Sequence, residues 1–240
     1  MSTAVPDPTD QQVLTIVGDP KPKNIAEVID RMNRIESVLQ NTDGLLWFNW
    51  LYRLVTSEVD LTSGWTNPEW LIRLDVVFAN MYFGAIETEL SGVGRTPKSW
   101  QALFEARHKP GIDRIQFALA GMNAHINRDL ALALLQTDQE FGIVPDKRSV
   151  EHQDFESVNG LLEAALPKTL NMLATGVLGE AAQDTGKIGR LLAMWNIRAA
   201  RDLAWDFADH LRNLNGLSRG VALAAQDQLT GTLGRAILAL

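Results

Sequence analysis

The sequence predicts an all-α protein, a single compact domain of about eight helices that is orthogonal or bundle-like and follows an extended N-terminal arm. Apolar residues recur three and four positions apart along most of the chain, as in amphipathic helices. No segment has the alternating pattern of a half-buried strand. The 240 residues are 46% hydrophobic, enough for a sizeable core. Because no change of composition divides residues 25–240, we predict an arm over 1–24 and one helical domain over 25–240.

The arm is expected to be extended because it is polar and rich in proline. Helical spacing begins after Asn24, a plausible N-cap with Glu27 at the capping-box position. This first helix ends near residue 41, and a Trp-rich helix follows over 45–58. The pair Asn67-Pro68 then has the form of an N-cap followed by a proline in the first turn, and it begins a largely apolar helix over 69–90.

Glycine and proline also divide the second half of the chain into helices. The longest and most apolar helix is expected over 112–140 and ends at Gly142. Pro167 is expected to interrupt the helix after it, and a glycine-containing linker is expected over 176–189. The remaining helices are predicted over 97–107, 150–166, 187–214 and 217–238.

Charge and composition exclude several classes of function. The net charge of −7 and the pI near 5.1 argue against nucleic acid or an anionic membrane as the main partner. No segment approaches the roughly 20 apolar residues of a membrane span, and the absence of cysteine excludes disulfides and thiolate sites. The N-terminal residues lack the apolar core of a secretory signal, so a cytoplasmic protein is expected. Glycine-rich phosphate loops and the GxSxG and HExxH motifs are missing too.

Polar residues in the centre of the helix over 112–140 are the strongest functional signal. His125 and Asp129 are four residues apart on a helix that otherwise looks buried. They could act as catalytic groups, or an imidazole nitrogen and a carboxylate oxygen at this spacing could bind one metal ion. Alternatively, Asp129 hydrogen-bonds His125 and the two only satisfy each other. Asn123 and Asn127 lie on a second stripe and are expected to bind substrate or to be structural.

Three further positions are candidates for the same site. Asp75 lies with Asn80 in an apolar helix and could be a general base or a ligand, with Asn80 binding substrate; an ion pair with an arginine is the alternative for Asp75. His152 could bring a second imidazole to the metal, or it could lie at the surface. Trp47 could line an apolar pocket, or it could belong to the core.

Two acidic residues in the helix over 187–214 form a weaker signal. Asp202 and Asp206 are four residues apart and repel each other unless a cation lies between them. Arg198 and Arg201 could supply that cation, and a metal ion is the alternative.

These residues support two functional hypotheses. The first is an enzyme with a His/Asp site in the helical core that acts as a hydrolase on a small apolar or amphiphilic substrate, with Zn or Fe as the candidate metal. The second is a metal-free protein that binds a small molecule, or a cyclase or isomerase that uses acid–base groups in an apolar pocket. The polar network could also serve only to fix helix register, and a homo-oligomer is left open. We expect any site where the helices over 69–90 and 112–140 meet.

Three blocks of the sequence resemble an uncharacterised bacterial family of the DUF5995 type. The blocks are LDVVFANMYFGAI, QFALAGMNAHINRDLALAL and HQDFESVN, and the resemblance covers about residues 45–212. It implies no activity. The residues that it implies to be at motif positions are Asp75, Asn80, Asn123, His125, Asp129, His152 and Asp154.

Overall fold

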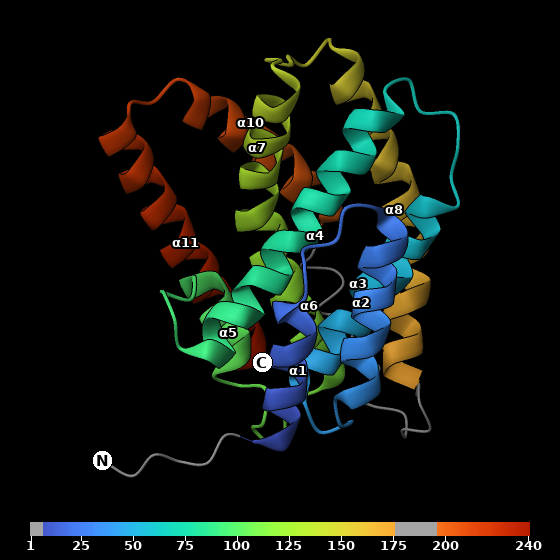
Figure 1. Cartoon of the computed structure of the whole chain (residues 1–240), viewed down its shortest axis with the longest axis vertical. Coiled ribbons are helices and arrows are strands. Elements are labelled where there is room, and N and C mark those ends of the chain that lie inside the picture. The colour runs from blue at the N-terminus through green and yellow to red at the C-terminus, as the bar shows by residue number, and fades with distance from the viewer. Residues whose placement is uncertain (1–6, 176–195) are drawn as a thin grey trace.

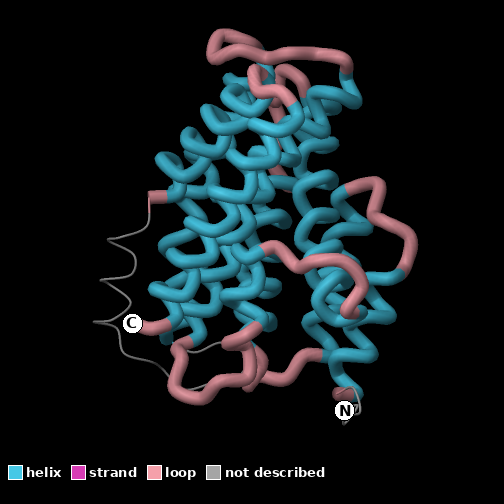
Figure 2. The backbone as a smooth tube through the Cα atoms, turned by 90° about the vertical axis from the view of Figure 1, so that its left-hand side faces the viewer, coloured by secondary structure: helices cyan, strands magenta, loops and turns pink. Residues whose placement is uncertain are grey.

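The computed structural model describes residues 7–175 and 196–240, and within these ranges the chain consists of helices and their connections, without a strand (Figures 1 and 2). The predicted all-α class is confirmed. The elements are α1 (Pro8–Gly18), α2 (Ile25–Val38), α3 (Gly44–Asp60), α4 (Pro68–Ser91), α5 (Lys98–Phe104), α6 (Arg114–Ala124), η1 (His125–Asp129), α7 (Leu130–Phe141), α8 (Val150–Thr175), α10 (Ile197–Arg212) and α11 (Gly216–Leu238).

The helix starts follow the predicted caps. Asn24 accepts a hydrogen bond from the backbone of Glu27, and Glu27 accepts one from the backbone of Lys23, so each side chain satisfies an N–H group at the start of α2. At the start of α4, the side chain of Asn67 accepts a hydrogen bond from the backbone of Trp70, directly before Pro68. These two signals were read correctly because capping depends on local chemistry alone.

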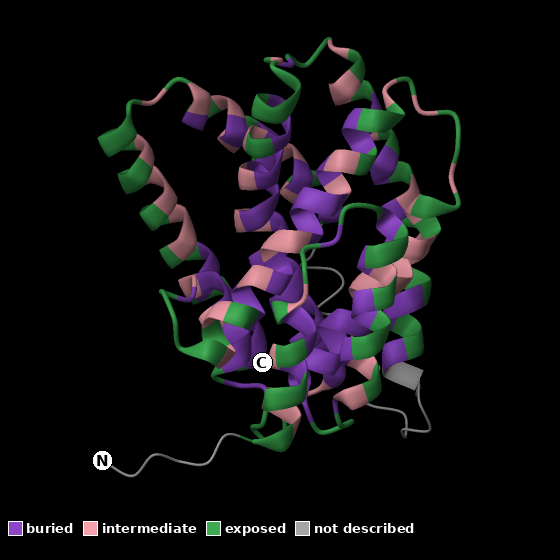
Figure 3. Cartoon of the chain, viewed as in Figure 1, coloured by how far each residue is buried: buried purple, intermediate pink, exposed green. Residues whose placement is uncertain are grey.

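The centre of the molecule is the rod formed by α6, η1 and α7, which α3, α4, α5, α10 and α11 surround (Figure 1). Every residue of α6 is buried, and Figure 3 shows the buried positions concentrated on this rod and on the helix faces that meet it. An apolar helix of this kind belongs in the middle of a helical protein. The rod therefore positions any residue that it carries against several neighbouring helices.

Two proline positions were predicted incorrectly. Residues 8–18 of the expected extended arm form α1, because Asp7 caps the helix, Pro8 occupies its first turn and Val13 and Val17 are buried. Pro167 does not interrupt α8, which continues to Thr175. Pro167 lies on an exposed side of α8, where water can satisfy the carbonyl group that loses its partner.

The long helix predicted over 112–140 is not α-helical throughout. Residues His125–Asp129 form a π-helical turn, η1, between α6 and α7. Such turns carry one extra residue, rotate the side chains that follow, and are frequent at functional sites. The linker predicted over 176–189 and the start of the helix predicted over 187–214 lie outside the described residues. No helix in the described part of the chain is long and apolar enough to cross a membrane.

Candidate functional site

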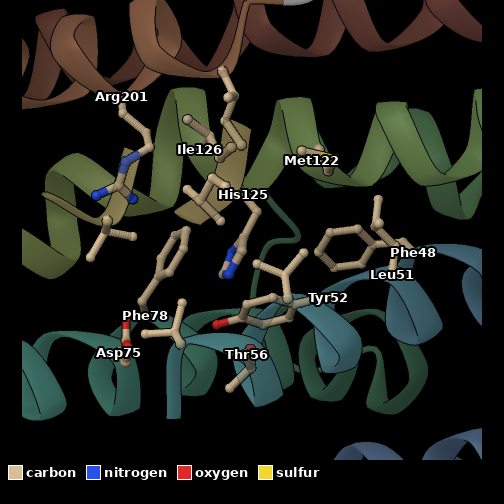
Figure 4. A pocket seen from close by; sticks show the side chains of 15 residues that line it. Phe48, Leu51, Tyr52, Thr56, Asp75, Phe78, Met122, His125, Ile126 and Arg201 are labelled. Carbon is tan, nitrogen blue, oxygen red and sulfur yellow. The ribbon is translucent and has the colours of Figure 1, made fainter. Parts of the chain in front are cut away.

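A pocket of about 70 Å³ lies where α3, α4, η1, α8 and α10 meet (Figure 4). Most of its wall is apolar, and Phe48, Phe78 and Leu162 are among the side chains that line it. The volume suffices for a few water molecules or a small organic group. The polar side chains in the wall are those of Tyr52, Thr56, Asp75, His125 and Arg201.

His125 is the first residue of η1, and its ring lies between aromatic side chains. It stacks on Phe78 with ring centroids 3.4 Å apart and an angle of 5° between the planes, and the edge of Tyr52 meets it at 4.6 Å. Only 2% of His125 is exposed. Burial lowers the pKa of His125 below its ordinary value of 6.5, although the Asp129 carboxylate acts in the opposite direction. The imidazole is therefore neutral at neutral pH.

Asp129 does not line the pocket itself, but it orients the His125 ring from behind. Its Oδ2 lies 3.3 Å from His125 Nδ1 and 2.8 Å from Nε1 of Trp100, and its Oδ1 accepts a hydrogen bond from Arg128. An ionised carboxylate only accepts hydrogen bonds, so Nδ1 of His125 carries the proton. Nε2 is then an acceptor. It is buried and has no hydrogen-bond partner among the described residues.

Asp75 projects from α4 into the same pocket. It is half-buried, and within the described ranges no hydrogen bond or ion pair involves its carboxyl group. Burial raises the pKa of Asp75 from 3.8 to about 7, while the charge of Arg201 lowers it and that of Asp60 raises it. Asp75 can therefore hold or release a proton near neutral pH.

Arg201 projects into the pocket from α10 and is held by fixed acceptors. Its Nε donates to Oδ1 of Asn159 at 2.6 Å, its Nη2 donates to the backbone oxygen of Phe155 at 2.9 Å, and the guanidinium lies 4.0 Å above the Phe155 ring. Burial lowers the pKa of Arg201 to about 10. The side chain still carries its positive charge at neutral pH.

Tyr52 and Thr56 lie one turn apart on α3 and complete the polar part of the wall. Burial raises the pKa of Tyr52 well above its usual range, and the carboxylates of Asp75 and Asp129 add to this effect. The phenol is therefore protonated and can donate a hydrogen bond. Together the wall offers a neutral base, His125, two weak acids, Asp75 and Tyr52, and a fixed cation, Arg201.

The structure places Asn123 and Asn127 away from this pocket, against α11. Nδ2 of Asn123 donates to the backbone oxygen of Thr230 at 2.8 Å, and Asn127 donates to Oδ1 of Asn123 at 2.9 Å. Gln116, on the same stripe, donates to the backbone oxygen of Ile237 at 2.8 Å. In this structure the stripe fastens α11 to the central rod, in line with the structural alternative for the two asparagines.

Asn80, Trp47 and His152 also lie outside the wall. Nδ2 of Asn80 donates to the backbone oxygen of Pro22 at 3.0 Å. Trp47 is buried, with the Arg114 guanidinium 5.4 Å above its ring. The ring of His152 meets the edge of Trp205 at 4.6 Å.

The expected set of metal ligands does not assemble. His125, Asp129 and His152 are not close enough to share an ion, and no other group of three histidine or acidic side chains in the described part of the chain is placed to hold one. Both oxygens of Asp129 already accept hydrogen bonds. Asp202 and Asp206 do not form a pair either, since Asp206 pairs with Lys147 and the pKa of Asp202 is raised by burial and by Glu156.

The profile of a family of unknown function, DUF5995, matches residues 25–240. The chain belongs to the DUF5995 family. Searches of curated proteins and of solved structures found no match. Because the function of the DUF5995 family is unknown, the roles of the residues at its motif positions are inferred from the geometry of this structure.

Those DUF5995 residues divide into two groups. Asp75 and His125 line the pocket, and Asp129 supports His125. The others make structural contacts: both carboxylate oxygens of Asp154, for example, accept hydrogen bonds from the backbone of residues 66 and 67 before α4, at 2.9 and 2.6 Å.

The sequence predicts Arg201 only as a counter-ion for two aspartates, Asp202 and Asp206. Its signal was visible, because it occupies the buried stripe of α10 together with Ile197, Trp205 and Ala208. An arginine on such a stripe needs buried acceptors or a ligand. Nothing in the sequence indicates that this stripe faces α3 and α4 across a pocket.

Proposed function

We propose that this protein is an enzyme that transfers protons on a small, mainly apolar molecule bound in the pocket beside η1. The observation that carries the proposal is the hydrogen bonding of the two imidazole nitrogens of His125. His125 lines the pocket, its Nε2 atom is buried and lacks a partner among the described residues, and its Nδ1 is held by Asp129. A buried polar atom without a partner costs free energy, so its retention suggests that a ligand satisfies it.

The chemistry follows from the protonation states. Nε2 of neutral His125 accepts a proton from a C–H bond beside a carbonyl group, and Asp129 stabilises the imidazolium that forms. Asp75, when protonated, donates a proton to another atom of the same substrate, which completes an isomerisation. The two side chains then exchange protons with water and return to their starting states. The pKa of Asp75, raised by burial to about 7, suits this role near neutral pH.

This proposal retains the acid–base residues of the two sequence hypotheses and favours the metal-free one. The favouring observation is that Asp129 already binds Trp100 and Arg128 and is placed to support the His125 ring. Carboxylate–histidine pairs of this kind serve as oriented bases in many enzymes.

Deuterium exchange tests the proposal without a known substrate. The protein is incubated in D₂O with short-chain ketones, aldehydes and 2-oxo acids, and NMR follows deuterium incorporation beside the carbonyl group. We expect accelerated exchange for at least one compound and its loss in His125→Gln. His152→Gln is the matched control, since His152 lies outside the pocket. If no compound exchanges faster than in buffer, or if His125→Gln retains the acceleration, the proposal is wrong.

A further inference from the structure

Arg201 presents a positive charge to one end of the pocket, and no side chain in the described ranges neutralises it directly. Nε and Nη2 donate to neutral acceptors, the side-chain oxygen of Asn159 and the backbone oxygen of Phe155. A guanidinium has five N–H donors, so three remain. Among the described residues, no ion pair within 4.0 Å involves Arg201.

Asp75 is the acidic residue that shares the pocket with Arg201, but the two do not meet. Figure 4 shows the guanidinium entering from α10 on one wall and the carboxyl group from α4 on the opposite wall, at the same end of the pocket. Their charges influence each other, yet neither a hydrogen bond nor an ion pair connects these two described side chains. The space between them is part of the pocket.

A desolvated arginine that contacts only neutral acceptors attracts an anion strongly. Its side chain is already immobilised by Asn159 and by the Phe155 ring, so Arg201 would lose little conformational entropy when a ligand binds. The rest of the pocket wall is mostly apolar, from Val55, Val59 and Leu162. A matching ligand therefore carries one negative group and a short apolar body.

We infer that the pocket takes a small monocarboxylate, whose carboxylate binds the free edge of the Arg201 guanidinium and whose apolar body extends toward His125. This inference rests on the proposed function, since it names the substrate class of the same pocket. The planar guanidinium edge matches a carboxylate in geometry as well as in charge. Asp75, in its protonated form, can donate a hydrogen bond to the same group.

Other charged groups act on this end of the pocket. Asp75, Glu156 and Asp202 stabilise the charged form of Arg201, and Arg198 opposes it. Of these, Asp75 is the group that lines the pocket. An ionised Asp75 would compete with a bound carboxylate by repulsion, so Asp75→Asn should strengthen carboxylate binding at pH 8.

Binding of acid and amide pairs tests the inference. Short straight-chain carboxylates from acetate to butyrate, which suit a pocket of about 70 Å³, are titrated by NMR against the full-length protein, each beside its own amide. At least one carboxylate should bind about 10- to 100-fold more tightly than its amide, which corresponds to the loss of one charged hydrogen bond. Arg201→Gln should remove this preference. Arg198→Gln should retain it, because Arg198 is a half-buried arginine of the same helix that lies outside the pocket wall and pairs with Glu163.

The outcomes separate the two proposals. If the amides bind as tightly as the acids, if no acid binds, or if folded Arg201→Gln retains the preference, the inference is wrong. If Arg201→Gln does not fold, the carboxylate affinity of Asp75→Asn at pH 8 tests the inference instead. Tighter binding than in the wild type supports the inference, and unchanged affinity contradicts it. Deuterium exchange on neutral ketones without carboxylate binding would leave the proposed function intact. Arg201-dependent carboxylate binding without exchange would leave the inference intact.

Discussion

The carboxyl group of Asp75 should make stability depend on pH in a way that Asp75→Asn removes. The pKa of Asp75 is raised by burial from 3.8 to about 7. Between these pH values the unfolded chain releases the proton while the folded chain keeps it, so the free energy of unfolding falls as pH rises. Below about pH 4 this stability is fully present, and above about pH 7 it has been lost.

The raised pKa sets an upper limit on the effect. The difference between 3.8 and about 7 is about three pH units, or about 4 kcal/mol at 1.36 kcal/mol for each. Because Asp75 is half-buried beside a pocket that admits water, we expect about 2 kcal/mol. The asparagine is nearly the same size and carries no charge. The variant should therefore match the wild type at pH 4 and exceed its stability at pH 8.

Thermal unfolding followed by circular dichroism at pH 4 and pH 8 measures this difference. For a chain of this length, about 2 kcal/mol corresponds to a rise in Tm of about 4–8 °C. Glu89→Gln, an exposed residue of the same helix α4, is the control and should change little at either pH. A Tm difference for Asp75→Asn that is equal at the two pH values would refute the reasoning.

Two further predictions concern the packing of the central rod. A Cβ atom added at Gly121 would lie 2.3 Å from Cγ of Phe48, whereas nothing lies within 4 Å of one added at Gly84. In thermal unfolding, Gly121→Ala should therefore lower the free energy of unfolding by about 1–3 kcal/mol, and Gly84→Ala should raise it by about 0.5–1 kcal/mol. Equal effects of the two substitutions would contradict this packing. Asn123→Ala removes the hydrogen bond to the backbone oxygen of Thr230 and should destabilise the protein by about 1–3 kcal/mol. Amide hydrogen exchange should then be faster in α11, and unchanged exchange there would show that Asn123 does not hold the helix.

Local chemistry explains which parts of the fold were predictable. Caps such as Asn24 and Asn67 act within one turn, so the sequence reveals them directly. Pro8 and Pro167 were misread because a proline is compatible with a first turn, and with a helix interior whose freed carbonyl meets water. The π-helical turn at His125 was missed because the polarity pattern does not encode a shift in backbone hydrogen bonding.

The sequence could identify polar residues of the candidate site, but not which helices pack against them. Asp75 and His125 stood out as polar residues on apolar helices, and the structure places both in one pocket. Asn123 stood out for the same reason, yet it faces α11. Arg201 lies 126 positions from Asp75 and reaches the pocket only through the packing of α10. Helical periodicity tells which face of a helix is buried, but not which element covers it.

The state of His125 is the central claim, and ¹⁵N NMR of the imidazole rings tests it most directly. The chain has four histidines, and His125→Gln identifies the signals of this one. Through the pH titration we expect a neutral ring with the proton on Nδ1, a bare Nε2, and a pKa below 6.5, the direction that burial imposes. A ring that carries its proton on Nε2 at pH 7, or that titrates above pH 6.5, would contradict the account.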